Sequence, residues 1–395
     1  MIASHPHLCY NAHDMRRIVP RDLSGNEAIR GLALGIAALH LSLSLLYSIV
    51  VPLWEAYDEW AHYKYAEYVA RQRALPDPRQ RLTHEYMYDE ASQPPLYYLL
   101  TALVLLPLDT SDGLQPQVNP HATRGDGAGG LNMAVHDPAI EGFPWQGTVL
   151  ALHLARLVSV LLSTLGLWPT YALARHLFPR TPTLVLGAMA FQAFLPHYVF
   201  MGGVVSNDIL VTVLGGVVLY FAVRVATGPW RAGDLVGLAV ASGLAAWTKL
   251  NGLALLPVAA VAVLVGVARG WRRPHLRRPL LPALVISLMS VVLLLGLWLG
   301  RNLRTVEHLL PRGAYALTIL RRSLERPEVV SRLKWDVLAQ GLGHALHTTW
   351  ASFGWGNLET FPWFYSLGNL LLLLALAGTM LYLVRPGRKD AARRG

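Results

Sequence analysis

The chain has 395 residues, of which 53% are hydrophobic and only 15% charged, and its mean hydropathy is +0.37. This composition is too apolar for a soluble globular protein and is typical of a chain embedded in a membrane. The formal net charge of +10 would suit a nucleic-acid-binding protein only if the bases lined one face of a soluble domain; here they are spread among the loops, so no nucleic acid is expected as a partner.

The first 28 residues are polar and are predicted to form a cytoplasmic tail. They lack the apolar core and the cleavage site of a signal peptide, so the apolar run that follows is expected to remain as a helix. Three histidines and the single cysteine of the chain occur in this tail. Their spacing fits no standard zinc pattern, so we interpret them as part of the tail rather than as a metal site. These residues are His5, His7, Cys9 and His13.

Long apolar runs recur along the whole chain. A run of about 18 or more residues is long enough to cross a ~30 Å hydrocarbon core as a helix. Such spans must be helical, because unpaired backbone groups are too costly in lipid. The sequence therefore predicts an all-α integral membrane protein with about eight spans. They are expected at residues 29–52, 148–174, 182–201, 208–227, 233–248, 251–268, 280–300 and 366–384.

The distribution of charge orients these spans. If the N-terminus lies inside, lysine and arginine gather in the cytoplasmic segments, above all in residues 269–278 and in the tail after Val384. Acidic residues gather in the segments on the opposite side. This distribution follows the positive-inside rule. We therefore expect a multi-pass protein of the cell's inner (cytoplasmic) membrane with both termini in the cytoplasm.

Two long segments, 53–147 and 301–365, are expected on the extracytoplasmic side. The apolar stretch Pro95–Leu108 lies within the first. Its length of about 14 residues is short for a span and suits a juxtamembrane helix lying in the interface. Tryptophans are frequent in both segments, as is typical of the headgroup level. The chain is thus divided into the tail 1–28, a transmembrane core 29–300 that includes the loop 53–147, the segment 301–365, and 366–395 with the last span and a basic cytoplasmic tail.

The segment Trp54–Tyr68 directly follows the first span and is predicted to be an interfacial helix. At helical spacing, Glu55, Asp58 and His62 share one face, and Glu59 lies beside them. A solvated acidic face is one interpretation of this pattern. A carboxylate pair surrounded by aromatic rings is also a good candidate for a general base or a metal ligand.

Three further charged positions lie at the outer ends of predicted spans. Asp208 begins one span, where an acid favours the helix dipole, so capping and a catalytic or metal role are both open. Lys249 lies in an outer turn between two spans, and Arg301 ends another. Each of these two bases either anchors the chain at the interface or holds an anionic phosphate.

Two other features have both a structural and a functional interpretation. Arg156 is the one charge well inside a predicted span, where a partner or snorkelling toward the headgroups normally satisfies it. His344, His347 and Trp350 lie at helical spacing in the second outer segment. An amphipathic interface helix accounts for this triplet better than a metal site does.

The order of these motifs resembles the GT-C class of membrane glycosyltransferases, which includes protein O-mannosyltransferases and the enzymes that add aminoarabinose to lipid A. The resemblance runs from about residue 30 to 300 and is closest to a poorly characterised multi-pass branch of that class. The matching motifs are Asp58-Glu59-Trp-Ala-His62 in the first outer loop, Gln93-Pro94-Pro95-Leu-Tyr-Tyr, His153-Leu-Ala-Arg156, the pair Asn207-Asp208, Thr248-Lys249-Leu-Asn-Gly, and His136 in the first loop.

This resemblance implies a sugar donor on a polyprenyl phosphate and a lipid, glycan or protein acceptor on the extracytoplasmic side, with membrane lipids around the protein. Asp58 and Glu59 would be catalytic, with Asp58 as the general base of an inverting transfer. No cofactor is certain; a divalent cation remains open, with Asp58, His62 and Asp208 as candidate ligands. The implied substrate-binding residues are His62, Glu90, Gln93, His136, Asn207, Asp208, Lys249 and Arg301.

Two other functions remain as alternatives. A transporter or lipid flippase has the same gross composition, but such proteins place ionisable groups or broken helices near the bilayer midplane. In this sequence the carboxylates lie almost wholly in the outer loops, which favours an enzyme facing the membrane surface. A scaffold without activity would tolerate the substitution Asp58→Asn, and an enzyme would not.

Overall fold

The computed structural model describes residues 23–78, 82–83, 90–122, 131–229, 231–271, 280–306 and 335–384. The described part is almost entirely helical. Several predictions concern residues outside it: the polar tail up to residue 22, the arginine-rich turn 272–279, residues 307–334 of the second outer segment, and the basic tail after Val384.

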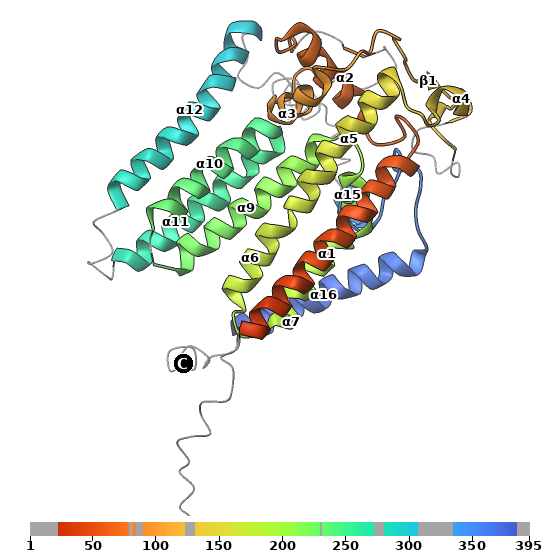
Figure 1. Ribbon diagram of the computed structural model, residues 1–395. Coiled ribbons are helices and arrows are strands. Elements are labelled where there is room, and N and C mark those ends of the chain that lie inside the picture. Colours follow the sequence, from red (N-terminus) through yellow and green to blue (C-terminus); the bar gives the residue numbers. More distant parts are fainter. Residues whose placement is uncertain are drawn as a thin grey trace, which may run out of the picture.

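Long helices lie next to one another in a layered bundle (Figure 1). Helix α10 packs against α9 and α12, α11 packs against α9, and α1 packs against α5. The helices of the bundle are α1 (Leu23–Val50), α5 (Gly147–Leu165), α6 (Leu167–Leu177), α7 (Pro182–Ala193), α8 (Pro196–Gly202), α9 (Asn207–Thr227), α10 (Ala232–Thr248), α11 (Leu255–Trp271), α12 (Leu280–Val306) and α16 (Pro362–Val384).

Within the described residues, five stretches are long and apolar enough to cross a membrane, and six if one bent pair counts as a single span. The predicted number of eight is therefore not confirmed. Helix α10 is a shorter apolar helix, and α12 coincides with the seventh predicted span but is not among the five. The five are Glu27–Val50, Gly147–Leu177, Asn207–Thr227, Leu250–Arg269 and Pro362–Leu381.

The bent pair corrects one predicted span. Residues 182–201 were expected to form a single helix, but α7 and α8 meet at an angle of 59°. Pro196 begins α8 and has no N–H to donate, so the helix cannot continue through it. The carbonyl of Ala193, at the end of α7, instead accepts a hydrogen bond from His40 on α1 at 2.8 Å. This buried bond gives a partner to a backbone carbonyl that the break in the helix leaves without one.

Smaller elements gather at one end of the bundle (Figure 1). This end, which we call the loop end, carries α2 and α3, which pack against each other. Two short strands at this end pair antiparallel, with Gln117 opposite Val135. The elements are α2 (Glu59–Gln72), α3 (Leu96–Leu105), β1 (Gln117–Val118), β2 (Ala134–Val135) and α4 (Pro138–Glu141); the chain also forms the 3-10 helix η2 (Leu250–Ala254) and α15 (Trp335–Trp350).

The start of α2 differs from the prediction. A helix was expected from Trp54, but α2 begins at Glu59 because Trp54 and Asp58 adopt left-handed backbone conformations, with φ of 66° and 52°. Two such residues cannot continue a right-handed helix. Glu55 therefore does not share a helix face with His62: its oxygens accept from Met133 and Ala134 of the first loop.

Aromatic side chains form the core at the loop end. Trp54 and Trp60, which were expected at the headgroup level, are almost fully buried there, and their rings meet edge to face with centroids 4.6 Å apart. Tyr65 and Tyr98 stack in parallel with centroids 3.8 Å apart. This packing fixes α2 against α3, because aromatic pairs of this geometry contribute beyond their buried area.

Candidate functional site

The candidate site lies at the loop end of the bundle, where five segments converge. Helices α2 and α3 supply residues from the first long loop. The N-terminus of α9, the C-terminus of α10 and the C-terminal part of α12 reach the same end (Figure 1). Helix termini carry backbone groups with no partner within the helix, so such an end offers both polar backbone and side chains to a ligand.

Asp58 occupies the position just before α2, in the left-handed region, and its side chain is half-buried. Asp adopts this region more readily than most residues, but a non-glycine residue held there still costs of order 1–3 kcal/mol. The surrounding fold must therefore fix this conformation. Strain of this kind is found preferentially at functional sites, which makes Asp58 a strong candidate.

Glu59, the next residue, has a very different environment. It is fully buried, and its two oxygens accept bonds from Arg156 at 2.8 and 2.6 Å. They also accept the backbone N–H groups of Val205, at 2.9 Å, and Trp54, at 3.2 Å. With four donors, this carboxylate has no readily available lone pair for a substrate.

Arg156 is equally saturated. Its side chain is fully buried, and besides Glu59 it donates to the carbonyls of Ser48, Val51 and Pro52 at 2.7 to 3.0 Å. The structure thus gives the charge inside α5 a partner. The pair ties α5 to the end of α1, to the start of α2 and to the segment before α9.

A hydrogen-bonded chain links α2, α3 and α9. The ring nitrogen Nδ1 of His62 lies 2.9 Å from the hydroxyl of Tyr98, and the amide of Asn207 donates to that same hydroxyl at 3.1 Å. Asn207 also donates to the carbonyl of Thr248 at 3.3 Å, which connects α9 to the end of α10. The side chains of His62, Tyr98 and Asn207 are all buried. His62 is therefore held in one orientation.

Asp208 and Lys249 form an ion pair beside this chain, with Nζ and Oδ1 2.6 Å apart. The side chain of Asp208 is 45% exposed and that of Lys249 18% exposed. Asp208 does not cap α9; Ser206 is the N-cap and accepts the Asp208 N–H at 3.2 Å. The acid is thus available for contacts with Lys249 and with a ligand.

Glu90, Gln93 and Arg301 form a second group near Tyr65. Glu90 and Gln93 are buried, and the Tyr65 hydroxyl donates to the carbonyl of Gln93 at 3.3 Å. Arg301 donates to the carbonyl of Pro76 at 2.5 Å. Burial raises the pKa of Tyr65 well above its usual value, with Arg301 opposing the rise, so the phenol stays protonated and acts as a donor.

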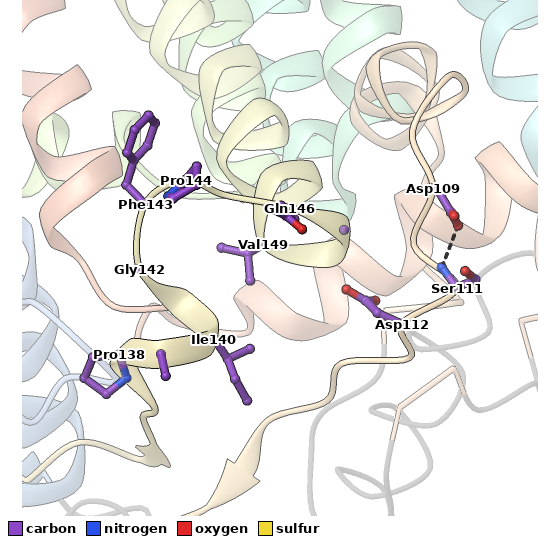
Figure 2. A pocket seen from close by; sticks show the side chains of 12 residues that line it. Asp109, Ser111, Asp112, Pro138, Ile140, Gly142, Phe143, Pro144, Gln146 and Val149 are labelled. Atoms are coloured by element: carbon purple, nitrogen blue, oxygen red, sulfur yellow. Dashed lines mark hydrogen bonds between the residues drawn. The ribbon is translucent and has the colours of Figure 1, made fainter.

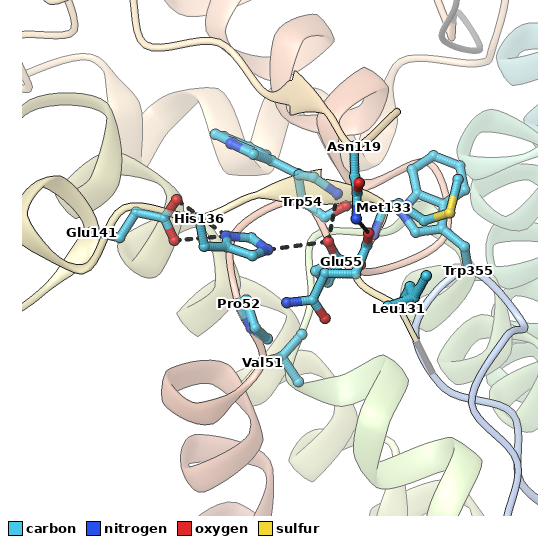
Figure 3. A network of polar contacts seen from close by, with 12 residues as sticks. Val51, Pro52, Trp54, Glu55, Asn119, Leu131, Met133, His136, Glu141 and Trp355 are labelled. Carbon is cyan, nitrogen blue, oxygen red and sulfur yellow. Dashed lines mark hydrogen bonds and ion pairs between the residues drawn. The ribbon is translucent and has the colours of Figure 1, made fainter. Parts of the chain in front are cut away.

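His136 lies in a different network, shown in Figure 3. Its Nδ1 is 2.9 Å from Glu141 and its Nε2 is 3.1 Å from Glu55. Glu55 also accepts the N–H groups of Met133 and Ala134 at 3.0 and 2.7 Å. The structure therefore does not place His136 with His62 and Lys249. Its contacts attach β2 and α4 to the segment between α1 and α2.

A polar hollow of about 700 Å³ lies beside the N-terminus of α5 (Figure 2). Asp109 and Asp112 line one side, and the turn Gly142–Pro144 lines the other. Asp112 accepts from the N–H and hydroxyl of Thr148 at 2.8 and 2.5 Å. Partial burial alone would raise the pKa of Asp112, but the Thr148 bonds outweigh it and the pKa falls below its usual value.

Sequence reasoning missed several residues of the site. Tyr98 and Ser206 were not singled out, although Tyr98 joins His62 to Asn207. The Tyr97 hydroxyl lies 2.8 Å from Ser159 and accepts the Ser206 N–H at 3.1 Å. The available signal was the pair of tyrosines directly after Pro95. A buried tyrosine usually needs a hydrogen-bond partner, which makes such a pair a marker for a polar network.

Within the described ranges, no group of three or more His, Cys, Asp or Glu side chains is arranged to hold a metal ion. In α15, the ring of His347 stacks on Tyr365 and its Nε2 lies 3.3 Å from Glu359. His347 is thus engaged with a neighbouring ring and an acid.

One comparison with known families gives a match. A family model described as dolichyl-phosphate-mannose-protein mannosyltransferase matches residues 151–298, less than half of the chain. This match supports a membrane glycosyltransferase of the GT-C type that uses a polyprenyl-phosphate sugar. The matched part includes Arg156, Asn207, Asp208 and Lys249, whereas Asp58 lies before it. Searches of curated proteins and of solved structures found no match.

Proposed function

We propose that the protein transfers a sugar from a polyprenyl-phosphate donor to an acceptor hydroxyl on the extracytoplasmic side of the membrane. The observation that carries this proposal is the convergence of Asp58, the His62–Tyr98–Asn207 chain and the Asp208–Lys249 pair at the loop end. Asp58 lies one helical turn before His62, whose backbone N–H donates to the Asp58 carbonyl at 3.0 Å. A half-buried carboxylate at the same end of a membrane bundle as a lysine suits a reaction between a lipid phosphate and a hydroxyl.

Asp58 is the general base of this proposal, and Glu59 is not. The choice rests on their surroundings, because Glu59 is fully buried and already accepts four hydrogen bonds. A base must be able to reach the proton that it removes. Glu59 instead fixes the backbone that precedes Asp58, directly through Trp54 and indirectly through Arg156, which donates to the carbonyls of Val51 and Pro52.

The reaction follows from these roles. The acceptor hydroxyl oxygen forms a bond to the anomeric carbon from the face opposite the phosphate, and its proton passes to Asp58. The bond between the anomeric carbon and the phosphate oxygen breaks, and the polyprenyl phosphate leaves with the electron pair. The configuration at the anomeric carbon is inverted.

Lys249 stabilises the charge that develops on the leaving phosphate. Its ammonium has three donors, of which the contact to Asp208 at 2.6 Å uses one. Asp208 orients the lysine, and the phosphate binds to the remaining donors. Arg301 extends the positive charge toward the same donor. This charge suits a monophosphate, so the proposal does not require a divalent cation, although Asp58, His62 and Asp208 are its candidate ligands.

His62, Asn207, Glu90 and Gln93 bind and orient the sugars. The buried Gln93 Oε1 and Asn207 Oδ1 atoms have no hydrogen-bond partner among the residues that the structure describes. A buried amide oxygen without a partner is costly, so a substrate hydroxyl would be a favourable ligand there. His136 is assigned to holding the first loop in place rather than to the substrate.

The alternative of a transporter or lipid flippase has one feature in its favour, the bend between α7 and α8. Transporters use interrupted helices near the midplane to bind their substrates. In this chain the carbonyl freed at the bend accepts from His40, whose other ring nitrogen lies 3.0 Å from Ser163. These contacts account for the bend as packing, which favours the enzyme.

The test is a transfer assay with the purified full chain. Radiolabelled mannose, glucose and aminoarabinose donors on polyprenyl phosphate would be mixed with lipid, glycan and peptide acceptors. We expect label in one acceptor class, and Asp58→Asn should reduce the rate about 10²- to 10⁴-fold, the usual contribution of a general base. Glu67→Gln, on the same helix but away from the site, is the control. Unchanged transfer by Asp58→Asn would contradict the proposal.

A further inference from the structure

An apolar groove with a volume of about 340 Å³ lies where α1 ends. This volume is within the ~300–1,000 Å³ range of sites that hold a ligand. The groove is formed by the last turn of α1, by α8 and by the loop before α16. Its main apolar residues are Leu46, Tyr47, Val50, Phe200, Phe353 and Leu358.

We propose that this groove binds the hydrocarbon chain of a lipid, and that this lipid is the acceptor of the sugar. The first part concerns a binding site and stands independently; the second rests on the proposed transferase function. Three observations support the proposal: the surface around the groove, its charge, and its connection to the segment that carries Asp58.

The surface around the groove is apolar and belongs to a helix that can span a membrane. Leu46 and Val50, on the rim, are 54% and 66% exposed, and Ile49 beside them is also exposed. The exposed row continues along α1 through Leu43 and Leu39. A lipid chain can therefore pass from the bilayer into the groove without crossing polar surface, and its burial there removes no hydrogen bonds.

The charge of the groove excludes a lipid phosphate as the group bound there. No lysine, arginine or histidine is among its lining residues, and the only acid is Glu55. The Glu55 oxygens are already taken by the N–H groups of Met133 and Ala134 and by His136. A phosphate would meet no counter-charge in the groove, in contrast to the surroundings of Lys249. The donor phosphate therefore binds elsewhere, and we assign the groove to the hydrocarbon chain of an acceptor; the KM measurements below separate this occupant from the polyprenyl chain of the donor.

The loop that forms one wall also contacts the segment leading to Asp58. The hydroxyl groups of Tyr57 and Ser352 are 3.1 Å apart, and the Trp355 indole donates to the carbonyl of Trp54 at 2.9 Å. Gly356 has φ of +85°, and a Cβ there would lie 1.9 Å from the Tyr57 hydroxyl, so the contact needs glycine. A chain held in the groove would bring its headgroup to the segment next to the base.

The binding part is tested without the reaction. The full chain with Asp58→Asn would be placed in nanodiscs that contain a neutral diacyl lipid with a diazirine near the end of one chain. After illumination, we expect labelled peptides from 46–52 and 353–358, and competition by the unlabelled lipid. Leu46→Trp fills the groove and should lower this labelling about tenfold, because the volume that holds the chain is lost. Leu358→Trp, from the opposite wall, should give the same loss.

Leu39→Trp is the matched control, since Leu39 is 58% exposed on the same helix and outside the groove. Equal labelling in the Leu46 and Leu39 variants would overturn the binding site. The acceptor role is tested in the active chain, where Leu46→Trp should raise the KM of a lipid acceptor and leave the KM of the donor unchanged. Loss of labelling with an unchanged acceptor KM would overturn the acceptor role, and transfer that fails in every variant would count against the proposed function instead.

Discussion

At the scale of single residues, neighbouring carboxylates before and within α2 differ in every physical respect that matters for chemistry. Asp58 is half-buried in a left-handed conformation, and Glu59 is fully buried in a saturated ion pair with Arg156. The sequence indicated both as candidate catalytic residues. It could not separate their roles, because the partner of Glu59 lies 97 positions away on α5.

The Glu59–Arg156 pair gives the first prediction. Glu59→Gln should lower the free energy of unfolding by about 3–5 kcal/mol, because it leaves the Arg156 charge buried without a counter-charge. Thermal denaturation of the detergent-purified chain measures this. Glu67→Gln breaks the partly exposed pair with Lys64 on the same helix and should cost less than about 1 kcal/mol. Equal effects of the two substitutions would show that the buried pair has no special structural role.

Lys249 gives the second prediction. Lys249→Gln should raise the KM of the polyprenyl-phosphate donor about 10- to 100-fold, the equivalent of losing one charged hydrogen bond of about 1.5–3 kcal/mol. Lys249→Arg should recover much of the affinity, because the charge is kept. Steady-state kinetics with varied donor concentration distinguish these outcomes, and Lys64→Gln is the control. If Lys249→Gln lowered only the affinity for the acceptor, the lysine would belong to the other substrate.

At the scale of elements, the predictions from sequence were wrong at positions where the backbone departs from a regular helix. Helix α2 starts at Glu59 rather than Trp54, because two left-handed residues precede it. The break between α7 and α8 was missed, although Pro196 signalled it, because the apolar run is continuous across the proline. Helix α3 was expected and is present at Leu96–Leu105. The prolines that open α3 are a signal in the local sequence. The contacts between distant parts of the long loop leave no such signal.

The N-terminus of α5 gives the third prediction. Asp112 has a pKa below its usual value, so its bonds to Thr148 add stability at neutral pH. This contribution is complete above the ordinary Asp pKa of about 3.9 and is lost as the pH falls through the lower folded value. The thermal midpoints of the native chain and Asp112→Asn should therefore differ at pH 7 and converge below about pH 4. A difference that grows on acidification would contradict this account.

At the scale of the whole molecule, the fold brings together residues that are far apart in the sequence. His62 lies in α2, Asn207 begins α9 and Lys249 follows α10, yet all three meet at one end of the bundle. Successive spans run in opposite directions, so every second turn lies at the same end. That convergence was predictable from the spans and the charge distribution. The number of spans was less so, because α10 is short and α7–α8 is bent.

The lining of the apolar groove could not be predicted either. It combines the end of α1 with a loop some 300 positions later, where Trp355 donates to Trp54. No local sequence pattern links these segments. The first has the sequence of an ordinary membrane helix end, and the second that of a Gly-rich turn. Only the packed structure shows that a lipid-facing helix and the segment carrying Asp58 share one wall.

Which side of the membrane the loop end faces is the measurement that tests the central claim most directly. Cys9 is the single cysteine, so Cys9→Ser gives a background in which Ser111→Cys, at the loop end, and Thr181→Cys, at the opposite end, can each be labelled alone. A membrane-impermeant maleimide applied to intact cells should label the cysteine at position 111 and reach position 181 only after lysis. Labelling of position 181 but not 111 in intact cells would place the proposed active site in the cytoplasm and contradict extracytoplasmic sugar transfer.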